Sequence, residues 1–157
     1  MRCLKVLILA LVLAAGSAWS VPLGDGLTAY AEGDYATALR LFRPLAEHGE
    51  SGAQYFLAEM YANGKGVPKD DQQAAFWLRK AAEQGDHDAQ SYLGYMYAMG
   101  QGVPKDDQHA DFWWLLASVG GDATAIKNRD LIEDRLTPQQ RAAAQADARN
   151  WKPKSAR

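Results

Sequence analysis

A histidine, a serine and two acidic side chains lie together at a point of the chain where hydrolytic chemistry could be imagined. His87 and Ser91 are four residues apart, so a helix places them on one face, and Asp86 and Asp88 are nearby. A hydrolytic triad also needs an orienting group, an oxyanion hole and a pocket, which the start of a helix does not supply. The two aspartates are better interpreted as a helix cap. We therefore expect no catalytic residue here.

The other chemically suggestive residues fit structural roles. His48 and His109 are isolated, and the sequence has no His-x-x-x-His pair for zinc. The Lys-Asp-Asp-Gln runs at 69–72 and 105–108 lack the oxygen-rich loop and closing Glu of a calcium site. The Gly-Lys-Gly sequence at 64–66 is too short for a phosphate-binding loop. We predict no metal site and no cofactor.

The elements that position these residues belong to an internal repeat. Residues 51–86 and 87–122 align without a gap and are identical at 20 of 36 positions, including the run GVPKDDQ. A fixed period of this size is typical of a solenoid. Ala is abundant and β-branched residues are scarce, which favours helices over strands.

Each repeat predicts two helices joined by a glycine-rich link. In 51–63 and in 70–84 the apolar residues recur at helical spacing. The aromatic pairs at 76–77 and 112–114 recur with the repeat, so we expect them in the core. Gly64 and Gly66 suit positive φ, either Asp70 or Asp71 can cap the second helix, and Gly85 can end it.

The helical pattern extends in both directions. A short helix around 25–32 and a Gly-Asp-Tyr turn precede a helix over 35–49. After the repeats we predict a helix over 123–135, and a capping box at 137–140 opens a last helix that runs to about Trp151. The polar tail 152–157 is expected to be frayed. The chain is thus all-α, with about eight helices in four hairpins.

The repeats resemble a known family. The frame of alanines, loop glycines and tryptophan is similar to the Sel1-like repeat, through Ala53, Leu57, Ala58, Tyr61, Gly64, Gly66, Val67, Asp70, Ala74, Trp77, Ala81, Ala82 and Gly85, and their counterparts 36 residues later. The resemblance implies a right-handed α-solenoid that serves as an adaptor for proteins or peptides. Some disulfide-rich relatives are linked to β-lactam binding. This chain lacks their cysteines, so we do not extend that property to it.

The resemblance also implies a domain organisation. Residues 51–86 and 87–122 are the full Sel1-like repeats. Residues 21–50 resemble a tetratricopeptide-like opening hairpin, and 123–157 form a degenerate capping hairpin with a tail. Terminal repeats of a solenoid are commonly atypical in this way.

The first twenty residues resemble an export signal. Arg2 and Lys5 precede an apolar run at 6–15, and small residues follow, so cleavage is expected after Ala18 or after Ser20. The alternative is an uncleaved anchor, although the run is shorter than the ~18 to 20 apolar residues of a membrane span. Cleavage removes Cys3, the only cysteine, and leaves 15 basic and 19 acidic residues, a net charge of −4. This mild acidity disfavours nucleic acid as a partner, and we expect location in a bacterial periplasm or secretion.

A partner-binding surface is predicted where the two repeats differ. On the first helix of each repeat, the stripe opposite the packing face is expected to line the concave side of the solenoid. Aromatic and methionine side chains suit peptide capture. The alternative is that the stripe consists of ordinary solvated side chains without a binding role. The stripe contains Tyr55, Glu59, Ala62 and Asn63, then Ser91, Tyr95, Ala98 and Met99, with Tyr30 before them and Lys127 and Leu131 after them.

A second surface becomes apolar in the second repeat. Leu115, Leu116 and Val119 replace the polar or charged residues 36 positions earlier. Either the final helix with Trp151 covers them, or they form a face for self-association or docking.

The function that we expect is an exported, non-enzymatic adaptor for a protein or peptide, without a membrane span once the leader is removed. Two alternatives remain open. One is a hydrolase or binding protein for cell-wall or β-lactam compounds, and the other is a membrane-tethered regulator with an uncleaved leader.

Overall fold

The computed structural model describes residues 20–155, and the predicted leader lies outside this part except at its last position. The described residues form eight α helices and one 3-10 helix, with no strand among them. Their bounds are α2 Ser20–Glu32, α3 Tyr35–Glu47, α4 Ser51–Asn63, α5 Asp71–Glu83, α6 His87–Met99, α7 Asp107–Val119, α8 Ala123–Ile132, η1 Glu133–Arg135 and α9 Pro138–Asn150.

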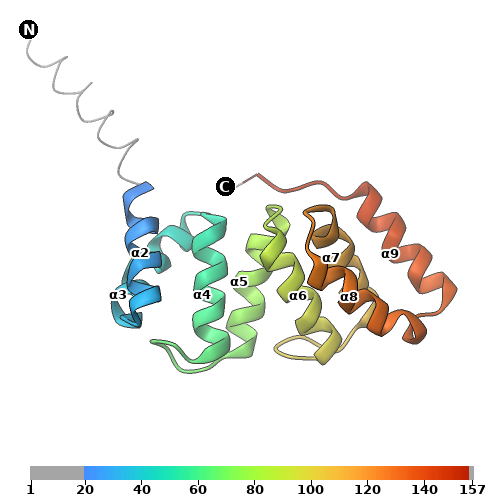
Figure 1. Ribbon diagram of the computed structural model, residues 1–157, viewed down its shortest axis with the longest axis horizontal. Coiled ribbons are helices and arrows are strands. Elements are labelled where there is room, and N and C mark those ends of the chain that lie inside the picture. The colour runs from blue at the N-terminus through green and yellow to red at the C-terminus, as the bar shows by residue number, and fades with distance from the viewer. Residues whose placement is uncertain (1–19, 156–157) are drawn as a thin grey trace, which may run out of the picture.

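The helices stand in a row along the long axis of the molecule (Figure 1). α2 packs on α3, α4 on α5 and α6 on α7, and each pair also packs on the next through α3 with α4 and α5 with α6. We call α2, α4, α6 and α8 the A helices and α3, α5 and α7 the B helices. The predicted all-α solenoid is confirmed. The opening helix is longer than predicted, because it begins at Ser20 rather than near residue 25.

Helix starts follow the period of the repeat. Asp34, Asp70 and Asp106 are spaced by 36 residues, and each caps a B helix with a side-chain oxygen that accepts from a backbone N–H. Of the two candidates at 70 and 71, the cap is therefore Asp70. Glu50, Asp86 and Asp122 cap α4, α6 and α8 at the same spacing. The capping box predicted at Thr137 also forms. The repeat therefore fixes where its helices begin.

The loop glycines let neighbouring repeats approach closely. Gly66 and Gly102 both have positive φ, of 71° and 66°. A Cβ on Gly66 would lie 2.8 Å from the backbone oxygen of Tyr35, and one on Gly102 would overlap the backbone oxygen of Asp71. A side chain at either position would push the loop away from the preceding B helix.

The core is built from small and large residues that interlock between helices. Ala38, Ala53, Ala74, Ala81, Ala89 and Ala117 are among the fully buried alanines, which allow helices to approach closely. Gly94 leaves room for Trp114, whose indole would collide with a Cβ there, and Trp114 donates to the carbonyl of Ser91 at 2.9 Å. The aromatic pairs divide: Trp113 and Trp114 are buried, whereas Phe76 is 49% exposed, so its prediction as a core residue was wrong. It lies on the outer face of α5.

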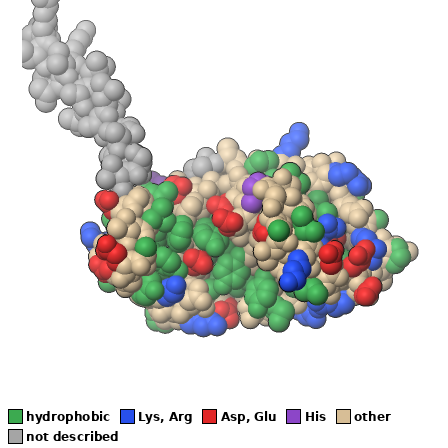
Figure 2. Space-filling model, viewed as in Figure 1, with side chains coloured by type: hydrophobic (Ala, Val, Ile, Leu, Met, Phe, Trp, Pro, Cys, Tyr) green, Lys and Arg blue, Asp and Glu red, His purple; other side chains and the backbone are tan. Residues whose placement is uncertain are grey.

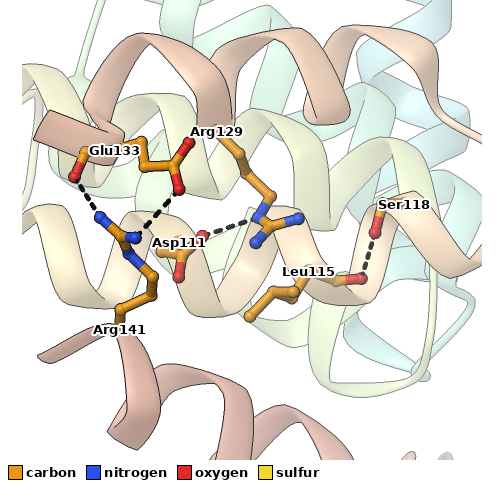
Figure 3. A network of polar contacts seen from close by, with 6 residues as sticks. All are labelled: Asp111, Leu115, Ser118, Arg129, Glu133 and Arg141. Atoms are coloured by element: carbon orange, nitrogen blue, oxygen red, sulfur yellow. Dashed lines mark hydrogen bonds and ion pairs between the residues drawn. The ribbon is translucent and has the colours of Figure 1, made fainter. Parts of the chain in front are cut away.

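The closing segment departs from the hairpin pattern. α9 packs mainly on α7, and charged side chains join α7, α8, η1 and α9 (Figure 3). Arg129 donates to the buried Asp111 with 2.7 Å between Nε and Oδ1, and Arg141 donates to the backbone carbonyl of Glu133 at 2.8 Å. Asp111 occupies the position of Ala75 in the preceding repeat. A buried charge and its partner thus stand where the first repeat is apolar.

The C-terminal tail is bound rather than frayed up to residue 155. It runs back from α9 along the solenoid (Figure 1). Lys154 donates its backbone N–H to the carbonyl of Glu83 at 2.7 Å, and its ammonium group lies 2.9 Å from the Glu83 carboxylate. These two contacts attach the tail to the last residue of α5, so the prediction of a frayed tail was wrong for this part.

The final helix covers most of the apolar surface predicted on α7. Leu116 is 6% exposed in a core cluster against which Ala148 and Trp151 pack. Leu115 is half-buried, and Val119 is 84% exposed. The described residues therefore leave Val119 as the one exposed member of that surface.

Candidate functional site

The A helices share an open hollow of about 420 Å³, which we call the tyrosine hollow. Residues from α4, α6 and α8 and the cap of α8 line it, so three successive pairs of the solenoid build it together. Its lining residues are Tyr55, Asp88, Ser91, Tyr92, Tyr95, Asp122, Thr124 and Asn128. On the face shown in Figure 2, hydrophobic and acidic side chains lie side by side over the middle of the molecule.

Three tyrosines form the aromatic part of this site. Tyr55 and Tyr92 are half-buried, and Tyr95 is 40% exposed. The ring centroids of Tyr92 and Tyr95 lie 6.4 Å apart in a tilted arrangement. Tyr55 packs edge-on against Phe56, with ring centroids 5.4 Å apart. Rings fixed by packing and partly open to solvent are suited to contacting a ligand at low entropic cost.

The electrostatic character of the hollow is negative. Burial raises the pKa of Tyr55 well above its usual value, and the nearby carboxylates of Glu59 and Asp88 raise it further. Burial and the charge of Glu59 also raise the pKa of Tyr92. Both phenols are therefore neutral donors at physiological pH.

The aspartates that cap α6 and α8 differ in their protonation equilibria, and Asp122 also lines the hollow. Burial raises the pKa of Asp86, and it outweighs the hydrogen bond from the N–H of Ala89. Burial acts in the same direction on Asp122, but hydrogen bonds from Ser91 and from the N–H groups of Ala125 and Thr124 outweigh it and lower the pKa. The hollow thus keeps Asp122 ionised through its own hydrogen bonds.

The structure brings three of the predicted partner-binding residues together. Tyr55, Ser91 and Tyr95 all line the tyrosine hollow. Tyr30 and Glu59 instead contact each other, since the Tyr30 hydroxyl donates to the Glu59 carboxylate at 3.2 Å. Lys65 donates to the same hydroxyl at 2.9 Å. Tyr30 and Glu59 therefore join α2 to α4 beside the hollow.

The other predicted residues lie outside the lining. Asn63 and Met99 are exposed at the last positions of α4 and α6, and Asn63 donates to the carbonyl of Glu59. Lys127 is exposed on α8, while its neighbour Asn128 lines the hollow. Ala62 and Ala98, placed on the stripe by the sequence, are buried at 9% and 4% exposure, so that part of the prediction was wrong. They belong to core clusters that include residues of the second helix of their own pair.

Sequence reasoning missed five of the lining residues. They are Asp88, Tyr92, Asp122, Thr124 and Asn128. The repeat contained the signal, because 88 and 124, like 92 and 128, are equivalent positions 36 residues apart. The lining begins in the first turn of α6 at Asp88 and of α8 at Thr124, and the predicted stripe did not include these starting positions.

The residues that suggested hydrolytic chemistry have different partners. His87 Nδ1 lies 3.1 Å from the side-chain oxygen of Gln90, and Ser91 hydrogen-bonds Asp122. Asp86 caps α6, as the sequence predicted, whereas Asp88, which was expected to share that role, lies in the first turn of the helix. His87 and Ser91 therefore interact with different residues and not with each other.

A second hollow of about 340 Å³ lies between α7 and α9. Phe112 and Trp151 line it, together with His109. The His109 ring stacks on Tyr97 with centroids 5.1 Å apart and contacts the Asp106 carboxylate at 2.8 Å. This hollow is formed between the second helix of the second repeat and the final helix.

The family of the chain follows from comparison with family models. The model of the Sel1 repeat matches residues 23–50, 51–86 and 87–122. The chain belongs to the Sel1 repeat family. Sel1 repeat proteins typically mediate interactions between proteins, and their repeat scaffolds are generally non-enzymatic.

Solved structures of Sel1 repeat proteins have the same fold. The protective antigen c5321 of uropathogenic Escherichia coli, which displays an SLR fold, is 34% identical with a TM-score of 0.81, over 91% of this chain and 32% of the antigen. A Sel1 repeat protein from Oxalobacter formigenes is 29% identical with a TM-score of 0.67, over 70% of this chain and 45% of that one. Cysteine-rich protein B of Helicobacter pylori is 30% identical with a TM-score of 0.55, over 57% and 68%.

One curated relative has a regulatory role. The exopolysaccharide production negative regulator of Rhizobium leguminosarum bv. viciae is 43% identical over 49 residues, which is 31% of this chain and 18% of the regulator. The chain spans about a third of the antigen's length and about a fifth of the regulator's. Among residues 20–155, none of the helices is both long and apolar enough to span a bilayer.

Proposed function

We propose that this Sel1 repeat protein is an exported, non-enzymatic adaptor that binds a protein or peptide in the tyrosine hollow. The observation that supports the proposal most is the hollow itself, where α4 and α6 present partly exposed tyrosines and α8 adds polar side chains on one open surface. Such side chains dominate binding energy at protein interfaces. An open surface built from successive repeats also fits an extended polypeptide better than a small molecule.

The docking role is tested by removing two aromatic anchors. The double variant Tyr55→Ala with Tyr95→Ala is compared with the native chain by crosslinking and pull-down from intact cells, with captured proteins quantified by mass spectrometry. The matched control is Phe76→Ala, which removes an exposed aromatic from a B helix. We expect the double variant to lose a specific partner that the control retains. Equal capture by all three chains would refute the docking role of the hollow.

Export is tested by the mass of the protein isolated from the producing cells. Cleavage after Ala18 gives a chain that begins at Trp19, and cleavage after Ser20 gives one that begins at Val21. Either mass in the periplasmic or secreted fraction supports export. A full-length chain in the membrane fraction would contradict it and favour the tethered regulator.

A further inference from the structure

The tyrosine hollow combines aromatic rings with negative charge that no neighbouring cation neutralises. Tyr55, Tyr92 and Tyr95 supply the rings, and Asp88 and Asp122 supply carboxylates. None of the described residues that line it is Lys or Arg. An aromatic surface with an adjacent carboxylate attracts a cation both through the ring faces and through the charge.

Of the two carboxylates in the hollow, only that of Asp88 has no partner among the described residues. Asp122 is engaged, because its side chain caps α8 through the N–H groups of Thr124 and Ala125 at 2.8 and 3.2 Å. Asp88 is exposed in the first turn of α6, and its carboxylate makes no hydrogen bond or ion pair with any other residue in the part of the chain that the structure describes. Its charge is therefore available to a ligand.

Three basic residues on or next to the A helices are held elsewhere or lie outside the lining. Lys65 donates to the Tyr30 hydroxyl and sits 4.7 Å from the centre of that ring. Arg129 is paired with the buried Asp111 on the side of α8 that packs on α7. Lys127 is exposed but does not line the hollow.

We propose that the tyrosine hollow binds a Lys or Arg side chain of the partner polypeptide. The aliphatic stem lies on the rings of Tyr55 and Tyr92, and the charged end pairs with Asp88. A hollow of about 420 Å³ has ample room for one long side chain. The inference rests on the proposed docking function and adds its specificity, since a negative hollow accepts a basic residue and repels an acidic one.

The test is a selection from a library of random dodecapeptides displayed on phage, with the full chain as bait. Native protein, Asp88→Asn and Asp88→Lys are selected in parallel. The control is Asp134→Asn, which removes the same charge from an exposed position outside the hollow. Binding of synthetic peptides that were enriched on the native chain is then measured by fluorescence anisotropy at low and high salt.

The proposal expects Lys or Arg to be enriched at one peptide position on the native chain and on Asp134→Asn. An enriched peptide should bind Asp88→Asn about fivefold more weakly than the native chain. Asp88→Lys should lose the basic preference entirely. Norleucine at the basic position should abolish the difference between native protein and Asp88→Asn, and high salt should reduce it.

Two outcomes would overturn the proposal, and they separate it from the docking function. If peptides bind and the Tyr55→Ala, Tyr95→Ala variant loses them, but no basic residue is enriched, the hollow docks polypeptides and the inferred specificity is wrong. If no peptide depends on Tyr55 and Tyr95, the docking function fails as well. Unchanged urea midpoints for the Asp88 variants establish that the exposed substitutions leave the fold intact.

Discussion

We call the packing of a B helix on the next A helix a joint, and the solenoid has three: α3 with α4, α5 with α6 and α7 with α8. The first two joints use the same contacts, and the third uses different ones. Between α3 and α4, and again between α5 and α6, a buried glutamine on the A helix donates to a carbonyl near the end of the preceding B helix. Gln54 donates to Ala46 at 3.0 Å and Gln90 to Ala82 at 3.1 Å. At the joint between α7 and α8 the equivalent residue is Ile126, which is 47% exposed.

A second repeated contact is also replaced at the third joint. Arg43 donates to Tyr61 and Arg79 to Tyr97 across the first two joints. The third has Leu115 and Glu133 at these positions, and it relies on the ion pair of Asp111 with Arg129 and on Arg135 with Asp107 at 3.5 Å. The repeated joints bury a neutral amide and place their arginines on tyrosine hydroxyls, whereas the third joint buries a carboxylate whose ion pair is costly to break.

The largest expected effect comes from breaking the ion pair of the third joint. Arg129→Ala leaves the Asp111 carboxylate, whose side chain is 3% exposed, buried without its partner. We expect a loss of about 4 kcal/mol in the free energy of unfolding, measured by urea denaturation. The double variant Asp111→Ala with Arg129→Met restores the alanine of the first repeat and should cost less than about 1 kcal/mol. Equal losses in both variants would mean that charge burial does not govern this joint.

A smaller effect is expected from a loop glycine of the repeated joints. Gly102→Ala places a Cβ against the backbone of Asp71 at a residue with φ of 66°, so the loop must shift. We expect a loss of about 3 kcal/mol in urea denaturation. The control Gly24→Ala lies in α2 with open space around it and should gain up to about 1 kcal/mol from helix propensity. A stability of Gly102→Ala equal to the native value would contradict the close approach.

The next largest loss of stability is expected from replacing the buried glutamines of the repeated joints. Gln54→Leu and Gln90→Leu each remove the side-chain donor to a carbonyl of the preceding helix, at positions 2% and 0% exposed, while the N–H of Gly49 or Gly85 still donates to that carbonyl. We expect each to lose about 1 kcal/mol of unfolding free energy, the net worth of one hydrogen bond, and to lose equal amounts because the joints are equivalent. Ile126→Gln at the third joint should change stability by no more than about 0.5 kcal/mol, since this position is exposed. Unequal losses for the two glutamine variants would show that the repeated joints differ in strength.

The smallest effect is a difference in acid sensitivity between two equivalent caps. The pKa of Asp122 is lowered in the folded chain, so its contribution to stability is present above its unfolded pKa and is lost as the pH falls through its folded pKa. The pKa of Asp86 is raised, so its protonation favours the folded chain as the pH falls.

Thermal unfolding measured from neutral pH down to pH ~3 distinguishes these caps. Asp122→Asn should reduce the loss of melting temperature on acidification. Asp86→Asn should increase it, because the compensating protonation is absent. Identical pH profiles of the two variants would contradict the opposite directions of the pKa shifts.

The repeat explains why so much of the fold could be predicted. The caps at Asp34, Asp70 and Asp106 and the loop glycines follow from one 36-residue pattern, in which local signals and period agree. The closing segment could not be predicted in the same way, because Asp111 and Arg129 are each unique to their repeat. Only packing of α8 on α7 brings them together.

The candidate site was predicted in part for a related reason. Helical periodicity identified Tyr55, Ser91 and Tyr95, which line the hollow. It could not show which turns of neighbouring A helices together enclose the hollow, because that depends on how the helix pairs pack on one another and not on the pattern within one helix. On α8 the prediction chose Lys127, whereas its neighbour Asn128, about 100° around the helix, lines the hollow.

The central claim is that a polypeptide partner docks on the A helices and not on the B helices. The most direct measurement places the photocrosslinking amino acid benzoylphenylalanine at position 95 or at position 76 of the full chain in its producing cells, followed by irradiation and denaturing electrophoresis. Both native side chains are exposed aromatics, at 40% and 49%. The account predicts a discrete crosslinked product at position 95 and none at position 76. A product at position 76 alone, or none at either position, would contradict it.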